Sequence, residues 1–481
     1  MRGLLSFSIS LENQEKINLK YSNQLEYEAF TFLTNNSSKF DIIIVGAGVL
    51  GITTAFWISE LYKCKIAIID KETKVAQHAT FRNTGVIHRP FYLDPEKKRI
   101  FAKSTQKSYY MWKRLASTYN LPWKQVETLE VALHENEIPI LEQYLEWGIK
   151  NQIPEEEISI LDSATVKTLE PQVECVGALR CITDTSVNLE RFTKSIFSLA
   201  TKNGVTLIRG KEVKNINEKN SQIELEVKDL EKTSQLSCNL LINNAGGGAV
   251  DIAHSLNLAK KYIDLHFRGN YWKVEEPFAS TITRNIYSIP TDTTYPFLDP
   301  HFIVKFDGTR EIGPSAALVF SPYAYEELSE STVKLVKKIF ERPITPKIKL
   351  ATNKKFQSMV WREWGITISK KALAQKIKRF IPNIKQTMFK TRGLPGVRNQ
   401  LIDEKGFIPE PIIIESPNTI HLLNYNSPGA TGAPAFSAHI VSQIQEKGYF
   451  NNLTKQKTQR YNKLWNFKNA KDYGKDKIKF Q

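Results

Sequence analysis

The sequence predicts an α/β protein in which a parallel-sheet domain, discontinuous in the chain, is joined to an α+β domain with a mainly antiparallel sheet. Three observations predict this fold class. A glycine-rich β-α-β pattern occupies residues 40–70. Two further glycine-rich junctions between a strand and a helix follow near residues 245 and 429. Between them, residues 262–389 contain alternating polar and apolar segments, which are typical of antiparallel strands.

The β-α-β pattern begins with an apolar run at residues 42–45, which predicts a buried strand. The run leads into Gly46, Gly48 and Gly51, which have the G-x-G-x-x-G spacing. Gly46 permits a tight turn, Gly48 lets a pyrophosphate approach the backbone, and Gly51 lets the following helix pack closely on the strand. The free N–H groups and positive dipole at the start of that helix suit a bound phosphate.

The second strand of the pattern is predicted at residues 66–69 and ends at Asp70, 19 residues beyond Gly51. An acid at this position accepts hydrogen bonds from ribose hydroxyls. Because strand, glycine loop, helix and acid follow in order, this stretch predicts dinucleotide binding. A membrane span is the alternative, since residues 42–59 carry no charge. The three glycines in that run and the β-α-β pattern around it argue against a span.

Composition limits the remaining classes. The chain has 481 residues, enough for two domains with cores of their own. Its four cysteines lack C-x-x-C spacing and predict neither a zinc site nor a disulfide framework, so we expect no metal. No secretory signal or transmembrane helix is predicted, and we expect a cytoplasmic protein, soluble or peripheral on the inner face of the cell membrane. The net charge of +16 could suit nucleic acid, an anionic membrane or an acidic small molecule. Without a nucleic-acid module, we expect no nucleic acid partner and favour a Lys-rich solvated surface.

The stretch after the β-α-β pattern, residues 80–92, is rich in turn formers and hydrogen-bonding groups. Arg82, Asn83, Thr84 and Gly85 suit a loop that passes its backbone along a cofactor, with an ordinary surface loop as the alternative. His88, from the same stretch, could be catalytic or structural.

Two later junctions repeat the opening arrangement. A strand at residues 240–242 leads to a glycine run and a helix, and a strand at residues 420–423 leads to residues 427–432 and another helix. Three separated junctions argue against a simple NAD-dependent dehydrogenase and predict a larger flavin dinucleotide, FAD, wrapped by a discontinuous Rossmann-like domain. The residues expected to contact FAD are Gly46, Gly48, Val49, Leu50, Gly51, Asp70, Lys71, Arg82, Asn83, Thr84, Gly85, Val213, Ala245, Gly246, Ser427, Pro428, Gly429, Ala430 and Thr431.

The junctions and the segments between them also predict domain boundaries. We expect an N-terminal appendage, two interleaved domains and a basic, solvated C-terminal tail. The ranges are 1–38 for the appendage; 39–107, 160–260 and 390–447 for the FAD-binding domain; 108–159 and 261–389 for the substrate domain; and 448–481 for the tail. Helices are expected in the substrate domain at residues 326–340 and 370–380.

Several short segments carry a resemblance to a known family. They are Thr84–His88 (TGVIH), His266–Tyr271 (HFRGNY), Asn285–Pro290 (NIYSIP), Pro296–Leu298 (PFL), His301–Phe302, Gly313–Pro314, Arg392–Arg398 (RGLPGVR) and Ser427–Pro428. In this order they resemble segments of the D-amino-acid-oxidase-like FAD oxidoreductases, and most closely the L-2-hydroxyglutarate dehydrogenase/oxidase family, over about residues 40–445. The chain departs from that family at Arg89-Pro90-Phe91, where small residues with Gly are usual, and we expect Arg89 and Phe91 on the substrate side.

The resemblance implies oxidation of a 2-hydroxy acid such as L-2-hydroxyglutarate to the 2-oxo acid. A base takes the hydroxyl proton, flavin takes the hydride, and cations hold the carboxylates. His301 is the first candidate for the base, because it occupies the family's G-V-H-F position, and His88 is the second. The expected substrate-binding residues are Arg268, Tyr271, Tyr287, Arg392 and Arg398. Each arginine could instead form a salt bridge or a cap, and each tyrosine could belong to the core.

Other functions stay open at this point. The flavin could serve an amino acid, a secondary amine or glycerol 3-phosphate. A non-catalytic flavin-binding or electron-transfer protein is the third hypothesis. The electron acceptor could be oxygen, a quinone or an electron-transfer protein, and the sequence does not indicate an oligomeric state.

Overall fold

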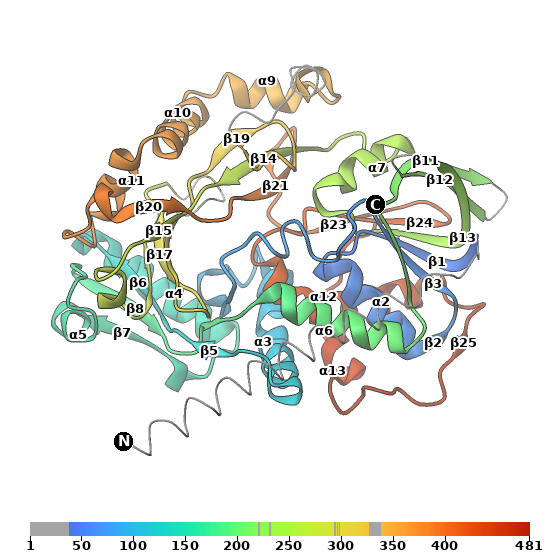
Figure 1. The fold of residues 1–481 in the computed structure, drawn as a ribbon, viewed down its shortest axis with the longest axis horizontal. Coiled ribbons are helices and arrows are strands. Elements are labelled where there is room, and N and C mark those ends of the chain that lie inside the picture. The colour runs from blue at the N-terminus through green and yellow to red at the C-terminus, as the bar shows by residue number, and fades with distance from the viewer. Residues whose placement is uncertain are drawn as a thin grey trace, which may run out of the picture.

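The computed structural model describes residues 38–219, 222–229, 232–292, 295, 297, 299–326 and 338–481. The expected N-terminal appendage therefore lies outside the described residues except for Ser38. Pro296, Leu298 and most of the helix predicted at residues 326–340 also lie outside them. Two large sheets lie side by side in Figure 1, one at the right beneath α7 and one at the left below α11.

The sheet at the right is built from three distant parts of the chain. Its strands are β1 (Lys39–Val45), β3 (Ile66–Asp70), β10 (Thr206–Arg209), β11 (Glu212–Lys219), β12 (Gln222–Lys228), β13 (Thr233–Asn243), β23 (Ile412–Glu415) and β24 (Thr419–Leu423). The strands β10-β3-β1-β13-β24 are parallel neighbours. The first half of β13 pairs with antiparallel β12 and its second half with β24. The predicted discontinuous parallel sheet is confirmed.

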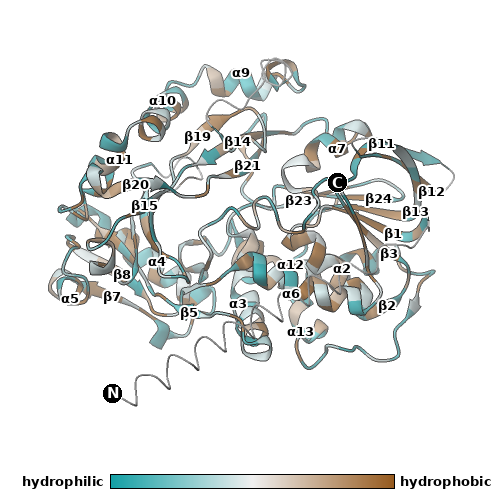
Figure 2. Ribbon diagram, viewed as in Figure 1, coloured by the Kyte–Doolittle hydropathy of each residue, from teal (hydrophilic) through white to brown (hydrophobic). Residues whose placement is uncertain are grey.

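Both faces of this sheet are buried because successive residues of β1 point to opposite sides. Ile42 and Ile44 share a core with the helices α2 (Val49–Leu61), α6 (Leu189–Lys202) and α12 (Gly429–Glu446). Ile43 and Val45 share a second core with β11 and β12. Figure 2 shows the central strands in the brown of apolar residues.

The second large sheet is mainly antiparallel, as the sequence predicts. Its strands, in spatial order, are β20 (Phe389–Arg392), β15 (Trp272–Val274), β18 (Arg310–Gly313), β17 (His301–Val304), β16 (Asn285–Ser288), β6 (Thr128–Ala132), β8 (Gly177–Cys181) and β7 (Ile158–Asp162). The pair β16–β6 is parallel and the other neighbours are antiparallel.

A smaller antiparallel sheet joins the two large ones. Its strands are β19 (Ala317–Val319), β14 (Ile263–Gly269), β21 (Gly396–Asp403) and β22 (Gly406–Phe407). Short strands pair elsewhere, namely β2 (Tyr62–Lys63) with β25 (Thr454–Lys455), and β9 (Thr185–Ser186) with β4 (Val86–Ile87) and β5 (Lys124–Gln125). The remaining helices are α3 (Arg99–Tyr119), α4 (Ile138–Lys150), α5 (Ser163–Leu169), α7 (Ala249–Ser255), α9 (Thr345–Ala351), α10 (Lys354–Ile368), α11 (Lys370–Ile377) and α13 (Phe467–Lys471).

Some expected domain boundaries do not follow these sheets. The boundary at residues 107/108 divides α3, although Ser108 Oγ donates to the Gly432 carbonyl and Trp112 Nε1 to that of Thr431, which joins α3 to α12. The segment from residue 160 was expected in the FAD-binding domain, yet β8 pairs with β6 and β7 in the second sheet. The first difference comes from a contact between two helices far apart in the sequence, and the second from the pairing of β8 with its neighbours β6 and β7.

The C-terminal segment 448–481 is not a solvated tail. Trp465 is only 2% exposed, and its ring lies 5.4 Å from that of Phe56 and 5.9 Å from that of Trp57 on α2. The segment also contributes Leu464, Phe467, Ala470, Tyr473 and Ile478 to the core of the parallel-sheet domain. The prediction was wrong because the many lysines are interleaved with apolar residues that pack inward.

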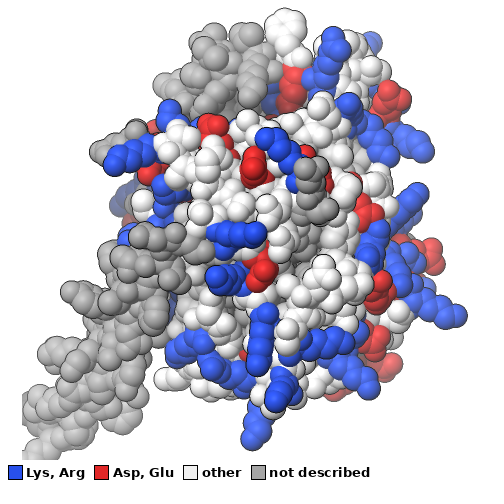
Figure 3. All heavy atoms as spheres, turned by 90° about the vertical axis from the view of Figure 1, so that its right-hand side faces the viewer, with Lys and Arg blue, Asp and Glu red and all other residues white. Residues whose placement is uncertain are grey.

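Charged side chains of both signs are exposed on the surface (Figure 3). On the face shown in Figure 3, blue basic side chains are interspersed with red acidic ones. Among the helices that the structure describes, none combines the length and the apolar character needed to cross a bilayer.

We expect Trp465→Ala to lower the free energy of unfolding by about 3–5 kcal/mol, because it removes a buried aromatic side chain and leaves a cavity. It also removes the 2.9 Å hydrogen bond from Nε1 to the Met111 carbonyl. Urea unfolding followed by circular dichroism measures the change. The exposed Lys468→Ala serves as the control, and equal stability of the two variants would contradict the packed C-terminal segment.

Candidate active site

The glycine loop between β1 and α2 leaves no room for side chains at two of its positions. Gly46 has a φ of +108°, and a Cβ there would lie 2.4 Å from the Asn244 carbonyl oxygen. A Cβ on Gly51 would lie 1.9 Å from the Gly46 carbonyl oxygen. A Cβ on Gly48 would meet only Thr80 Oγ1, at 3.4 Å, so the space beside this backbone is open. This arrangement fits the turn, the close approach and the helix packing expected of the three glycines.

Asp70 lies against this loop at the end of β3. Its carboxylate accepts hydrogen bonds from Ala47 N at 2.6 Å and from Glu72 N at 2.8 Å. Burial raises the pKa of Asp70, and the two backbone donors oppose that rise. Lys211 N donates to the Asp70 carbonyl at 3.0 Å, which brings the start of β11, where Val213 lies, to the same edge of the sheet.

The loop at residues 80–88 runs between the first and third glycine-rich junctions. Thr80 Oγ1 accepts the N–H of Val49 in the first turn of α2 at 3.0 Å. At the other end of the loop, His88 N lies 3.4 Å from Thr431 Oγ1, at the start of α12. Gly85 has a φ of +75°, and a Cβ there would lie 2.7 Å from the Val187 carbonyl oxygen. Residues predicted to contact one cofactor from separate parts of the chain are therefore close together.

Two of the predicted FAD-contacting residues place their cationic groups over tyrosine rings. Lys71 Nζ lies 3.1 Å from the centre of the Tyr323 ring, and the Arg82 guanidinium lies 4.0 Å from that of Tyr325. A Cβ on Gly248 would approach the Tyr323 hydroxyl to 3.2 Å. The second glycine-rich junction thus faces a segment of the other domain.

These features fit FAD. Strands β1, β13 and β24 are parallel, so their carboxyl ends and the junctions that follow lie at one edge of the sheet, where α/β proteins bind dinucleotides. The open space beside the Gly48 backbone, together with Asp70 at the end of β3, matches a pyrophosphate and a ribose.

Side chains expected on the substrate side lie in a row across β17, β16 and β6. Ile286 pairs with Phe302, and Tyr287 pairs with Glu130, so His301, Tyr287 and Glu130 share one face of the sheet. The rings of Tyr287 and His301 are stacked with their centres 4.0 Å apart.

His301 is held as a neutral imidazole. Its Nδ1 lies 3.0 Å from the Asp299 carbonyl oxygen and donates to it, which leaves Nε2 with a lone pair. Nε2 is buried and has no hydrogen-bond partner within the described part of the chain. Burial lowers the pKa of His301 to about 3, and the charge of nearby His88 lowers it further. His301 can accept a hydrogen bond at neutral pH but is poorly suited to retain a proton.

His88 has a carboxylate partner. Its Nδ1 lies 3.2 Å from Oδ2 of Asp184. Asp184 is fully buried and also accepts hydrogen bonds from Arg89 N at 2.7 Å and Thr128 Oγ1 at 2.8 Å. The His88 ring is edge-on to that of Tyr287, with centres 6.2 Å apart, so both predicted histidines lie beside one tyrosine.

Of the three predicted arginines, the structure brings Arg398 to this region. Burial lowers its pKa to about 10, and the charge of Tyr92 opposes that effect. Its Nη2 donates to Gln400 Oε1 at 3.2 Å and Asn426 Oδ1 at 3.4 Å, beside the start of α12.

Arg268 and Arg392 are placed differently. Phe267 pairs with Arg398, whereas Arg268 pairs with Val397, so Arg268 lies on the opposite face of the small sheet from Arg398. There Arg268 Nη1 donates to the Glu326 carbonyl at 2.6 Å. Arg392 is exposed at the edge of the second sheet, with its guanidinium 4.9 Å from the Trp272 ring. The geometry does not group these two residues with the histidines.

Tyr271, the other predicted tyrosine, is buried in a small cluster with Val86 and Ile303. Burial raises its pKa well above the ordinary value, and the nearby Glu311 carboxylate adds to the rise. It therefore lies against the loop that carries His88.

Arg89 and Phe91 do not line the substrate side as expected. Arg89 is fully buried, its Nη2 lies 2.9 Å from Glu157 Oε2, and its guanidinium lies 4.2 Å from the Tyr109 ring. Phe91 packs in a separate apolar cluster that includes Leu141. Both side chains are accommodated by packing that the sequence motif does not reveal.

The geometry adds three residues to the candidate site that the sequence did not indicate, namely Asp184, Glu130 and Tyr92, whose ring lies edge-on to that of His88 with centres 6.0 Å apart. Asp184 follows a strand in a stretch that the sequence indicates only as a turn. Glu130 is 5% exposed, and burial together with the charge of Asp184 raises its pKa to about 8. An acid within an otherwise apolar strand, residues 128–132, was the signal that could have found Glu130.

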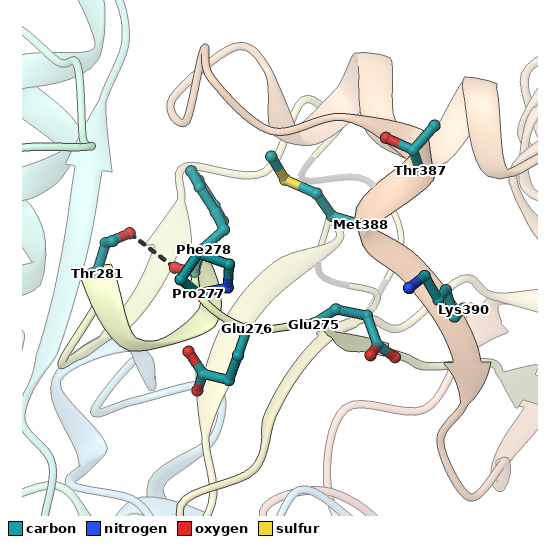
Figure 4. Close-up of a pocket in the computed structure, with 8 residues that line it drawn as sticks. All are labelled: Glu275, Glu276, Pro277, Phe278, Thr281, Thr387, Met388 and Lys390. Atoms are coloured by element: carbon teal, nitrogen blue, oxygen red, sulfur yellow. Dashed lines mark hydrogen bonds between the residues drawn. The ribbon is translucent and has the colours of Figure 1, made fainter.

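A separate surface cavity of about 380 Å³ lies beside β15 and β20. Figure 4 shows its lining, which includes Phe278 and Met388 and shares no residue with the region around His88 and His301. It is not the candidate site.

Comparison with known proteins agrees with this geometry. Residues 41–444 match the family model described as DAO, FAD dependent oxidoreductase, so the chain belongs to this family and is an FAD-dependent oxidoreductase. It is 28% identical to the L-2-hydroxyglutarate dehydrogenase of Indibacter alkaliphilus over 82% of this chain and 96% of that protein. It is 26% identical to the human mitochondrial L-2-hydroxyglutarate dehydrogenase over 86% of this chain and 90% of that protein.

Solved structures share the fold. One is an L-alpha-glycerophosphate oxidase from Mycoplasma pneumoniae with FAD bound, at a TM-score of 0.68 and 23% identity, covering 88% of this chain and 97% of that one. Another is an L-proline dehydrogenase from P. horikoshii, at a TM-score of 0.62 and 17% identity, covering 88% and 96%.

We expect Glu130→Gln to stabilise the protein increasingly as the pH rises. The folded pKa of about 8 lies above the ordinary value of 4.5, so between these values the unfolded chain releases a proton that the folded protein retains. The free energy of unfolding of the protein with Glu130 therefore falls as the pH rises through this window, by on the order of 3 kcal/mol at pH 7. The Gln variant carries no titrating group at this position and avoids that loss. Urea unfolding at pH 5 and pH 7.5 measures the difference. The exposed Glu135→Gln is the control, and a gain that does not grow with pH would contradict the prediction.

Proposed function

We propose that this protein oxidises an L-2-hydroxy acid, of the L-2-hydroxyglutarate type, to the corresponding 2-oxo acid. The observation that carries the proposal is the pair of histidines beside Tyr287, one with a free buried lone pair and one backed by a carboxylate. The names of the sequence relatives support the same substrate class. When bound, FAD supplies the acceptor for the hydride from carbon 2.

The two histidines suit different tasks, and the roles differ from the order that the sequence predicts. His88 is the better base, because the Asp184 carboxylate at Nδ1 stabilises the imidazolium formed when Nε2 takes the hydroxyl proton. His301, whose pKa is about 3, serves as a neutral acceptor that orients the hydroxyl through Nε2. Arg398 holds the substrate carboxylate, and Tyr287 fixes the ring of His301 by stacking.

An amine or amino acid is the second candidate substrate. The Asp184 carboxylate is buried beside His88, and a negative charge there would attract an ammonium group rather than a second carboxylate. An amine is oxidised in its neutral form and has no hydroxyl proton to remove, so it does not depend on a histidine base.

The spectrum of the purified protein under anaerobic conditions tests the function. We expect L-2-hydroxyglutarate to bleach the oxidised flavin band, since hydride transfer reduces the flavin when no acceptor is present. Glycine, L-proline and glycerol 3-phosphate are the comparison substrates. If one of these compounds alone bleaches the band, that compound is the substrate in place of the hydroxy acid. A protein purified without flavin would contradict the assignment of the glycine loop.

We expect His88→Ala to slow anaerobic flavin reduction by the hydroxy acid by roughly 10²–10⁴-fold, the usual contribution of a positioned general base. Asp184→Asn should also slow flavin reduction, because the uncharged amide cannot stabilise the imidazolium of His88. Stopped-flow absorbance measures the rate as a function of pH. The exposed His134→Ala is the control, and His88→Ala with an unchanged rate and pH profile would remove His88 from the mechanism.

A further inference from the structure

We propose that helices α9, α10 and α11 present a surface that docks on an anionic membrane. The name α9–α11 face denotes a set of exposed apolar side chains with the lysines around them. Phe340 and Ile344 precede α9, Ile348 lies on α9, and Trp361 and Ile368 lie on α10. Phe340 is 69% exposed, Ile348 58%, Trp361 77% and Ile368 70%. Figure 1 shows the three helices along one rim of the molecule, remote from the parallel sheet.

The exposure of the apolar residues follows from the way α10 packs. Its buried residues include Phe356, Met359 and Ile366, which contribute to the cores beneath the helix. At 3.6 residues per turn, Trp361 and Ile368 lie on the opposite side of the helix, and a spacing of seven residues places them on one stripe. The helix is therefore apolar on two sides, although a solvated helix needs only one apolar side.

The same segment holds most of the surplus charge of the chain. Residues 338–379 contain twelve Lys and Arg against two Glu, an excess of ten positive charges out of the net +16. Neither glutamate offsets the exposed lysines, since Glu341 pairs with Lys338 at 2.8 Å and Glu363 is 5% exposed and accepts the N–H of Ala316. Exposed lysines flank the apolar stripe at positions 354, 355, 371 and 378.

Together these features favour a lipid surface over other occupants. An amphipathic helix with Trp and Ile on one side and Lys beside them is the arrangement that inserts into the interface of a bilayer. Anionic headgroups attract the lysines, and each lysine near the surface adds to binding. A second copy of this chain is a poorer occupant, because two faces with such an excess of positive charge would repel each other.

Co-sedimentation of the full-length holoenzyme with vesicles tests the proposal. We expect binding to vesicles of phosphatidylcholine with phosphatidylglycerol, little binding to phosphatidylcholine alone, and weaker binding as salt is raised. Trp361→Ser with Ile368→Ser should lower the partition coefficient at least tenfold, and Lys371→Glu with Lys378→Glu should do the same. Flavin content and anaerobic reduction by substrate should be unchanged, since these residues lie outside the candidate site.

Matched variants elsewhere on the surface provide the controls. Tyr119→Ser with Ile149→Ser makes a similar apolar change on α3 and α4, and Lys463→Glu with Lys468→Glu makes the same charge change in the C-terminal segment. Binding that these controls weaken equally, or no binding to anionic vesicles, would overturn the proposal. Dimerisation in sedimentation velocity that Trp361→Ser abolishes would assign the face to a second copy and would also overturn it.

Discussion

The close approach of the β1–α2 turn to the end of β13 is the constraint on which the rest of the structure depends. Gly46 N donates to the Ile69 carbonyl and Asn244 N to that of Val45, so the ends of three parallel strands are joined by backbone hydrogen bonds. The approach is possible only because Gly46 and Gly51 lack a Cβ. Once it is made, the start of α2, the Asp70 carboxylate and the second glycine-rich junction must lie at one edge.

The start of α12 extends this edge toward the second sheet. The Thr431 carbonyl accepts a hydrogen bond from Trp112 Nε1. The Thr431 hydroxyl lies 3.4 Å from both the His88 backbone nitrogen and the Val86 carbonyl oxygen. His88 is thereby fixed between the cofactor edge and the strands that carry Tyr287 and His301. No single segment contains the site, and each part is positioned by a strand or helix that belongs to another stretch of the chain.

This distribution explains which features the sequence could predict. The β-α-β unit is local, and its glycines and strand periodicity specify it within residues 40–70. The faces of Arg268 and Arg398 depend on the register between β14 and β21, which are more than a hundred residues apart, and no local pattern specifies that register. Asp184 was missed because its partners, Arg89, Thr128 and His88, come from other elements. The C-terminal segment was misjudged because its composition outweighed its few buried aromatic residues.

The electrostatics of the site follow from burial and have a consequence for the substrate. Burial keeps His301 neutral and Glu130 protonated at pH 7, so neither contributes a charge. Burial and the charge of Arg398 lower the pKa of Lys98, while burial lowers that of Arg398 itself. Holding two cations close together in a partly buried space costs free energy, and a bound anion reduces that cost. In the function proposed above, a substrate carboxylate at Arg398 would relieve the repulsion between these two cations, and the neutral acid of Glu130 would add no negative charge to oppose it.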